Sequence, residues 1–412
     1  MNGDLLIKNI GVLATPTGTS AASGSKQGGC VRVMKDAYVL ARNGIITEVG
    51  TGEPPEVTDD RLVIDAGGRL VTPGLVDAHT HLIFGGWRQN ELDQKLKGRT
   101  YLEILEAGGG ILSTVRATRA ASEEELEEKA EKVLREMLSF GVTTCEAKSG
   151  YGLERATEMK QLEVMRRLNG KGPVELVPTF MGAHALPEEY REDRDSYVKL
   201  LCDDLIPEVA EKGLAEYCDV FCEQGVFTAD ESVRILEAAK AHGLGCKIHT
   251  DEICDIGGTA AAEEVGAVSA EHLIMADAAG IERLARGGVI ACLLPCTSFY
   301  LGADYANARG MIDAGVPVAM ATDFNPGSCP ANNMQFVINV GCLKYRMTPE
   351  EVLTAVTLNG AAAIGRADRI GTIEPGKQAD LVIWDAPDLP FICYRMGSNL
   401  VSKAVKNGAV YE

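Results

Sequence analysis

The chain has 412 residues, of which 46% are hydrophobic and 24% are charged, a composition ordinary for a globular enzyme. The formal net charge of −19 argues against nucleic acid and anionic membranes as partners, although one local arginine is enough to bind a small anionic substrate. No apolar run approaches the roughly 18 residues of a membrane span, and the first residues lack a secretory pattern, so we expect a cytoplasmic protein.

Both ends of the chain are predicted to form short strands. Near the N-terminus these cover 5–10, 37–42, 45–49 and 61–65, and Asn43-Gly44 is a strong hairpin signal. Near the C-terminus they cover 379–384 and 400–405, followed by a turn at Asn407-Gly408. The stretch 18–29, rich in Gly and Ser, is predicted to be a loose loop. We therefore expect one small β-sandwich domain assembled from residues 1–73 and 364–412.

The middle of the chain, residues 74–363, alternates predicted strands and helices. Ser122-Glu-Glu-Glu125 is a capping box, and the apolar side chains after it recur at helical spacing, which predicts a helix from 122 to about 138. A predicted strand follows at 141–146, and similar units recur along the segment. Repeated strand–helix units over nearly 300 residues favour a (β/α)8 TIM-type barrel over a doubly wound sheet, and no Gly-x-Gly-x-x-Gly follows a strand to support a dinucleotide-binding fold.

Several histidines stand at the ends of predicted strands. His79 and His81 follow an apolar run, and residues two apart on a strand point to the same side. His249 ends the run Lys247-Ile-His, and Asp323 ends the run from Ala319. Three imidazoles and one carboxylate at the rim of a barrel suit zinc or iron, with a position left for water. Such a metal lowers the pKa of bound water from about 16 to near 7.

The same rim carries candidates for proton transfer. Asp323 can take the proton of the water, His272 can polarise a carbonyl, and Glu252 can carry the proton to a leaving nitrogen. Three of the candidate residues also have a structural interpretation. His249 can be a core histidine, Asp323 can cap a turn, and Glu252 can be a solvated loop acid. His242, at a helix end before a glycine, is expected to face the helix dipole and receives no role in the site.

Two motifs resemble the amidohydrolase superfamily, namely Pro73–His81 for its first strand and Gly371–Val382, running on to Asp385, for its closing segment. Further runs resemble one family within it, the imidazolonepropionases, and the resemblance covers essentially the whole chain. These runs are Phe84–Arg88, Lys148–Gly152, Thr179–His184, His249–Glu252, Ala270–His272 and Thr322–Ser328.

The resemblance implies hydrolysis of 4-imidazolone-5-propanoate to N-formimidoyl-L-glutamate, in histidine degradation, by a homodimer. It also implies one divalent or trivalent metal ion, zinc or iron, held by His79, His81, His249 and Asp323, with His272 assisting the chemistry. The residues that it places against the substrate are Arg88, Tyr151, His184, Glu252, Asn325, Gly327 and Ser328. A propanoate tail suits the bidentate fork of an arginine, and a tyrosine hydroxyl can donate to the same carboxylate.

Some features leave alternatives open. Cys296 stands where a small residue is expected, and Lys148 is either structural or substrate-supporting. The strand around Pro178 carries no lysine for a carbamylated bridge between two metals, which favours one metal. The segment from Tyr101 to Ser113, with three consecutive glycines, is a candidate lid.

Two other functions remain possible. A related deaminase acting on a guanine- or cytosine-like base would share the metal ligands but would not need Arg88 and Tyr151 to hold a carboxylate. A non-catalytic relative should have lost metal ligands, whereas this chain keeps all of them.

Overall fold

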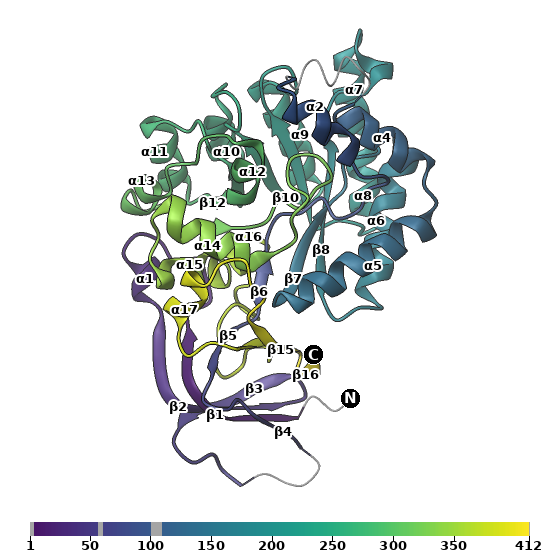
Figure 1. The fold of residues 1–412 in the computed structure, drawn as a ribbon. Helices are drawn as coiled ribbons and strands as arrows, with labels where there is room; N and C mark the ends of the chain where they lie inside the picture. Colours follow the sequence, from purple (N-terminus) through teal and green to yellow (C-terminus); the bar gives the residue numbers. More distant parts are fainter. Residues whose placement is uncertain (1–3, 57–60, 100–108, 412) are drawn as a thin grey trace.

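The structure, a computed structural model, describes residues 4–56, 61–99 and 109–411. Two sheets organise it: a parallel barrel surrounded by helices, and a mixed sheet beside which both chain ends lie (Figure 1). The predicted lid, 101–113, lies outside the described residues except for its last five, where helix α4 (Ile111–Ala120) begins. The prediction of an α/β barrel with a β unit built from both termini is confirmed.

The mixed sheet joins the two ends of the chain in the order β16-β15-β14-β5-β1-β2-β3, with β4 paired to β1. Asn43 and Gly44 join β2 to β3, and Asn407 and Gly408 join β15 to β16, all four with the positive φ that such two-residue turns require. The boundaries at 73/74 and 363/364 stay a prediction. The strands are β1 (Leu5–Thr15), β2 (Arg32–Arg42), β3 (Ile45–Thr51), β4 (Leu62–Asp65), β5 (Leu70–Pro73), β14 (Leu381–Trp384), β15 (Val401–Lys406) and β16 (Ala409–Tyr411).

The barrel is built from eight strands whose neighbours pair in parallel in chain order. Its first and last strands meet beyond their ends, where Thr80 bridges Phe324. There the Asp323 amide donates to His79 O (3.0 Å) and the His81 amide donates to Phe324 O (2.9 Å). The strands are β6 (Leu75–Asp77), β7 (Val142–Lys148), β8 (Glu175–Ala183), β9 (Tyr217–Cys222), β10 (Gly245–Thr250), β11 (Ser269–His272), β12 (Ile290–Leu293) and β13 (Val318–Met320).

Helices surround the barrel, and the predicted capping box begins one of them. The Glu125 amide donates to Ser122 Oγ (3.2 Å) and the Ser122 amide donates to the Glu125 carboxylate (2.8 Å), so α5 begins where the sequence predicts. Besides α4, the helices are α1 (Lys26–Gly29), α2 (Leu92–Leu96), α5 (Glu123–Ser139), α6 (Arg155–Asn169), α7 (Arg194–Leu200), α8 (Ile206–Glu211), α9 (Ala229–Ala241), α10 (Gly258–Val265), α11 (Ala278–Gly287), α12 (Pro295–Leu301), α13 (Ala308–Asp313), α14 (Met334–Tyr345), α15 (Pro349–Ala355), α16 (Leu358–Ala363) and α17 (Leu389–Tyr394).

Two local predictions were wrong. The stretch 18–29 is not a loose loop, because it contains helix α1 and the fully buried side chain of Gln27. Gln27 exchanges hydrogen bonds with both backbone groups of Val318 at 3.0 Å, which fixes this segment against the barrel. In addition, β6 ends at Asp77 and β13 at Met320, so His79, His81 and Asp323 lie beyond the strands and not on them.

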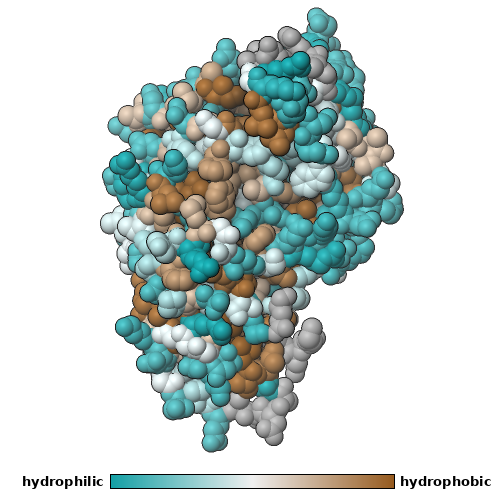
Figure 2. All heavy atoms as spheres, in the orientation of Figure 1, coloured by the Kyte–Doolittle hydropathy of each residue, from teal (hydrophilic) through white to brown (hydrophobic). Residues whose placement is uncertain are grey.

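The surface is mixed in character. Figure 2 shows hydrophilic side chains over α5 and α6, and hydrophobic patches nearer the middle of the same face. Among the residues that the structure describes, no helix combines the length and apolar character needed to cross a membrane.

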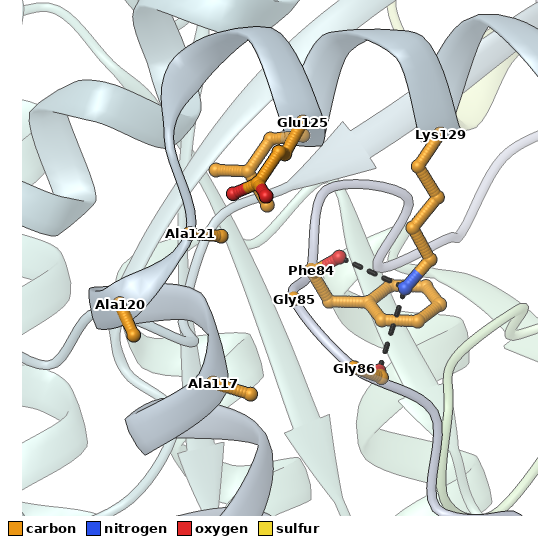
Figure 3. Close-up of a pocket in the computed structure, with 9 residues that line it drawn as sticks. Phe84, Gly85, Gly86, Ala117, Ala120, Ala121, Glu125 and Lys129 are labelled. Atoms are coloured by element: carbon orange, nitrogen blue, oxygen red, sulfur yellow. Dashed lines mark hydrogen bonds between the residues drawn. The ribbon is translucent and has the colours of Figure 1, made fainter.

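A hollow of about 430 Å³ opens on the outside of the barrel, between α4, α5 and the segment Phe84–Gly86 (Figure 3). Lys129 reaches into it and donates to Phe84 O (3.0 Å) and Gly86 O (3.4 Å), with its ammonium 3.5 Å from the centre of the Phe84 ring. None of the predicted site residues lines this hollow. Its relevance to function is indirect, since Lys129 fixes the segment that leads to Arg88.

Candidate functional site

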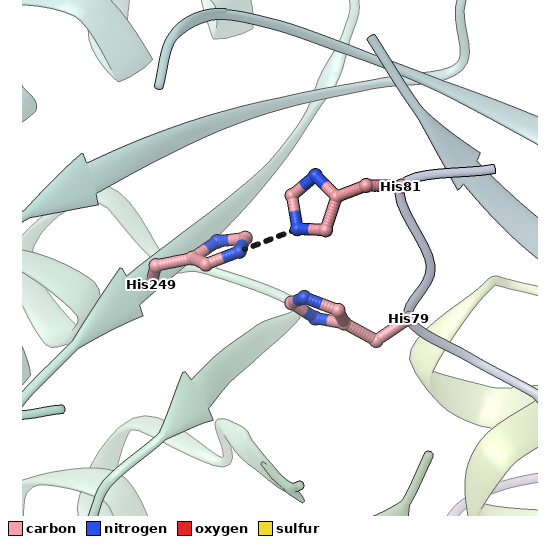
Figure 4. Close-up of side chains that lie close together, drawn as sticks. All are labelled: His79, His81 and His249. Atoms are coloured by element: carbon pink, nitrogen blue, oxygen red, sulfur yellow. Dashed lines mark hydrogen bonds between the residues drawn. The ribbon is translucent and has the colours of Figure 1, made fainter. Parts of the chain in front are cut away.

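Three histidines from two parts of the barrel converge on one point (Figure 4). His79 and His81 come from the segment after β6, and His249 comes from β10. Their ligand atoms all lie within 4.8 Å of one another, and all three side chains are buried. His79 Nε2 has no hydrogen-bond partner among the described residues, and His81 Nε2 lies 3.4 Å from His249 Nε2. Buried Nε2 atoms that converge in this way fit a metal ion, which would supply the partner that His79 Nε2 lacks.

The orientation of two imidazoles is set by carboxylates behind them. His79 Nδ1 donates to Glu271 (2.7 Å), and His249 Nδ1 donates to Asp219 (3.0 Å). Because the proton then sits on Nδ1, each Nε2 is left with a lone pair that faces the centre of the cluster. Burial lowers the pKa of His79 and His81 well below the usual value, so these rings are neutral, as metal ligands must be.

Asp323 lies against the same cluster. Its Oδ1 atom is 3.5 Å from the Nε2 atoms of both His79 and His81, and its Oδ2 atom accepts a hydrogen bond from Thr297 (2.5 Å). Burial raises the pKa of this carboxyl group. The backbone at Asp323 has φ of 57°, a conformation that costs energy in any residue other than glycine and that clusters at functional sites. The geometry therefore suits Asp323 as a fourth ligand or as a proton acceptor beside the metal.

His272 and Glu252 form a pair next to the histidine cluster. The His272 ring centre is 5.3 Å from that of His249, and His272 Nε2 is 3.6 Å from the Glu252 carboxylate. Burial lowers the pKa of His272 to about 3 and raises the pKa of Glu252 to about 7. Near neutral pH the pair thus consists of a neutral imidazole and a carboxyl group that readily gains or loses a proton, which suits general acid–base chemistry.

Arg88 is held in place by Glu91. Its Nε atom lies 3.1 and 3.2 Å from the two Glu91 oxygens, and only 10% of the arginine side chain is exposed. The guanidinium lies over Gly327, close enough that a Cβ atom there would stand 2.2 Å from Nη1. Gly327 belongs to the loop that begins at Asp323, so Arg88 and the histidine cluster border the same loop.

The Gly327→Ala variant tests that close approach. The φ of Gly327 is not positive, so the backbone accepts alanine, but the new methyl group must displace the guanidinium. We expect kcat/KM for the imidazolone substrate that the family resemblance implies to fall by about 10- to 100-fold. Small misplacements of positioning groups have effects of this size. Steady-state kinetics beside Gly29→Ala, where a Cβ meets open space, provide the check. Equal kinetics for both variants would show that the position of the guanidinium does not matter.

Tyr151 and His184 stand beside His81. The His184 ring is stacked on that of His81, with centres 4.7 Å apart and an interplanar angle of 17°. His184 Nδ1 lies 3.1 Å from Gly150 O, and burial lowers the pKa of this histidine to about 3. Tyr151 is buried, and its ring centre is 5.8 Å from that of His81. The structure thus places both residues beside the cluster, and their contact with the substrate stays a prediction.

Asn325 and Ser328 are used within their own loop. The Asn325 amide nitrogen donates to Asp323 O (2.7 Å) and Ser328 Oγ (2.9 Å), and its oxygen accepts from the Gly327 and Ser328 amides (2.8 and 2.7 Å). These hydrogen bonds fix the conformation of the loop, and the place of Asn325 and Ser328 against the substrate stays a prediction. Through the loop, Asn325 positions Asp323 and Gly327.

Sequence reasoning missed the residues behind the ligands. Asp219 and Glu271 orient two imidazoles, Thr297 binds Asp323, and Glu91 holds Arg88. One signal was present in the sequence: Asp219, in Tyr217-Cys-Asp-Val-Phe-Cys222, is a charged residue inside an otherwise apolar strand. Such residues are rare in barrel cores unless they are paired. Cys296, left open by the sequence, is buried on α12 immediately before Thr297.

The fold and the sequence both have known relatives. The model of the amidohydrolase family matches residues 70–410. The imidazolonepropionase of Alkaliphilus metalliredigens is 53% identical over 98% of this chain and 97% of its own, and that of Bacillus velezensis is 51% identical over 98% and 96%. Among solved structures, the guanine deaminase of E. coli covers 99% of both chains with a TM-score of 0.76.

These comparisons differ in what they establish. The deaminase is only 17% identical, so that likeness concerns the fold alone. The two imidazolonepropionases match along their whole length at about half of all positions. The chain therefore belongs to the amidohydrolase family and, within it, to the imidazolonepropionases.

Proposed function

We propose that the chain hydrolyses 4-imidazolone-5-propanoate to N-formimidoyl-L-glutamate, with one metal ion at the histidine cluster. The observation that carries this proposal is the 53% identity to an imidazolonepropionase across 98% of the chain. The buried cluster of His79, His81 and His249 supports it, because a metal ion held there would supply hydroxide at neutral pH to open a cyclic amide. The substrate is a small molecule, and its carboxylate suits an arginine.

The metal would be held by His79, His81 and His249, with Asp323 as the fourth ligand. Three neutral imidazoles and a carboxylate suit zinc and iron alike. When bound, the metal lowers the pKa of water to near 7 and so supplies hydroxide at neutral pH.

The surrounding residues would perform the proton transfers. The Asp323 carboxylate would take a proton from the attacking water, which adds to the ring carbonyl carbon. His272, neutral and next to the cluster, donates a hydrogen bond to the developing oxyanion. Glu252 delivers a proton to the ring nitrogen as the C–N bond breaks, and its pKa of about 7 suits this exchange. The products are a new carboxylate and the formimidoyl group.

Arg88 would bind the propanoate tail, with Tyr151 donating to the same carboxylate. Glu91 keeps the guanidinium in one orientation, and Gly327 leaves it room. His184, stacked on His81, would form the wall of the pocket beside the imidazolone ring.

Hydrolysis in oxygen-18 water tests the reaction directly. The proposal predicts that one labelled oxygen enters the newly formed carboxylate of N-formimidoyl-L-glutamate and that no ammonia is released. An imidazolone that is left unchanged, or a product without the label in its new carboxylate, would contradict the proposal.

The Glu252→Gln variant should separate catalysis from stability. We expect kcat to fall by about 10²- to 10⁴-fold, because a proton-transfer group is lost. The folded-state pKa of Glu252 is raised from 4.5 to about 7 by burial, so its contribution to folding is full below pH 4.5 and is lost as the pH rises through 7. Glutamine stays neutral, so metal-free Glu252→Gln should unfold with up to about 3 kcal/mol more free energy than wild type at pH 8.

Urea unfolding of the metal-free proteins at pH 4 and pH 8 measures the difference. The gain in the free energy of unfolding should vanish at pH 4, where the Glu252 carboxyl group is neutral, as the glutamine amide is at any pH. Glu192→Gln, at an exposed position, serves as the control and should change neither activity nor stability. A Glu252→Gln variant without any gain at pH 8 would show that the folded-state pKa of Glu252 is not raised.

We also propose that the protein acts as a homodimer in the cytoplasm. Large apolar side chains on and next to neighbouring helices are exposed and favour self-association: Phe299, Leu301, Leu343, Tyr394 and Met396. The contacts of α14 with both α12 and α17 bring these helices together. Sedimentation velocity gives the oligomeric state, and a single monomeric species at micromolar concentration would contradict this part of the proposal.

A further inference from the structure

A chain of buried charges runs beneath the histidine cluster. It comprises Glu146 and Lys148 of β7, Asp219 of β9, Lys247 of β10 and Glu271 of β11, all 0% exposed. Three carboxylates face two ammonium groups, so the chain carries one net negative charge. Because each buried ion loses its hydration, such an arrangement stabilises the fold little, and apolar side chains of similar volume would do as well or better.

The contacts follow one another without a break from one imidazole to another. His249 donates to Asp219 (3.0 Å), and Asp219 pairs with Lys148 (2.7 Å). Lys148 meets one oxygen of Glu146 (2.8 Å), and Lys247 meets the other oxygen (2.9 Å). Lys247 lies 3.7 Å from Glu271, which accepts from His79 (2.7 Å).

Glu146 is the middle of this chain and touches no ligand histidine. One of its oxygens contacts Lys148, on the side of Asp219, and the other contacts Lys247, on the side of Glu271. Burial lowers the pKa of the Lys148 ammonium, but Asp219 and Glu146 outweigh this and raise the pKa above its usual value, so the lysine stays charged. Thr179 Oγ1, from β8, donates to the same Glu146 oxygen that meets Lys247. Loss of the Glu146 charge would leave both lysines to draw Asp219 and Glu271 away from the imidazoles.

We propose that Glu146 is a positioning residue for the metal centre: through Lys148 and Lys247 it fixes the two carboxylates that orient His249 and His79. This inference rests on the metal site of the proposed function. It accounts for why the barrel keeps five buried charges in a layer that an apolar core could fill. It also gives Lys148 a structural role in the site, in place of contact with the substrate.

The test is the Glu146→Gln variant, which keeps the size of the side chain and removes its charge. We expect the Kd for Zn²⁺, measured by competition with a chromophoric chelator, to rise by about 10- to 100-fold, as when outer partners of metal ligands are lost. With Co²⁺ in place of Zn²⁺, the visible absorption bands should shift, because the imidazoles change orientation. If Glu146 only stabilised the fold, neither the Kd for Zn²⁺ nor the Co²⁺ absorption bands would change in the folded variant.

Two variants keep the outcome interpretable. Asp380→Asn breaks another buried ion pair, with Lys406 at 2.8 Å in the mixed sheet, and should lower stability while leaving the Kd for Zn²⁺ unchanged. If Glu146→Gln does not fold, Thr179→Val removes one hydrogen bond to Glu146 and should raise the Kd by a few-fold. Wild-type Zn²⁺ affinity in folded Glu146→Gln, or in Thr179→Val if the first does not fold, would overturn the inference. Wild-type protein that binds no Zn²⁺ would instead refute the proposed metal site itself.

Discussion

The His249→Ala variant is expected to lose its bound metal ion and its hydrolytic activity together. His249 presents a nitrogen lone pair to the cluster because Asp219 holds the proton on the other side of the ring. Replacement of an outer partner weakens metal binding by about 10- to 100-fold, and removal of the ligand itself should have a larger effect. Metal content per chain after gel filtration, together with turnover of the imidazolone, measures both losses.

His242→Ala provides the matched control. His242 lies seven residues earlier, exposed at the end of α9, and the sequence gives it no role in the site. This variant should keep a full complement of metal and wild-type turnover. A His249→Ala protein that folds, retains metal and turns over substrate at the wild-type rate would show that the cluster is not the catalytic metal site.

The Arg88→Met variant is expected to lose affinity for the carboxylate of the substrate. Removing a charge-assisted bidentate contact should lower kcat/KM by about 30-fold or more, equivalent to roughly 2 kcal/mol. Methionine preserves most of the apolar stem, so packing changes little. The same comparison on an imidazolone without the propanoate tail should show little difference between variant and wild type.

Arg88→Lys separates charge from geometry. Lysine keeps the positive charge next to Glu91, which is only 3% exposed, but it lacks the planar fork. An intermediate loss of kcat/KM is therefore expected. Equal losses for the tailed and the tailless substrate in Arg88→Met would contradict the assignment, because they would reflect the unpaired Glu91 and a distorted loop.

Much of the fold could be predicted because its signals are local. The capping box at Ser122 begins α5, and the Asn-Gly pairs make the hairpin turns of the mixed sheet. The stretch 18–29 was predicted wrongly for a long-range reason. The burial of Gln27 depends on hydrogen bonds to Val318, almost 300 residues away, and glycine content carries no information about such a contact.

The ligands could be predicted but not the residues that support them. His79, His81 and His249 stand out because histidines at strand ends are few and the family motifs contain them. Glu146, Asp219 and Glu271 lie in buried strands, where only the assembled barrel brings opposite charges within 4 Å. Glu91 was equally hidden, since a lone acid three residues after Arg88 is typical of any surface segment.

The site disfavours both rival functions. The fold is shared with a guanine deaminase, but at 17% identity the likeness does not extend to a substrate. A non-catalytic relative is disfavoured because all the predicted ligands come together in the structure. Arg88, held over Gly327, further favours a substrate with a carboxylate over a neutral base.

The most direct measurement is the loss of imidazolone absorbance when metal-loaded protein meets fresh 4-imidazolone-5-propanoate, with guanine and cytosine tested in parallel. We predict rapid loss for the imidazolone alone, abolished by a chelator and restored by zinc or iron. Turnover of guanine or cytosine, with the imidazolone left unchanged, would contradict the proposed function.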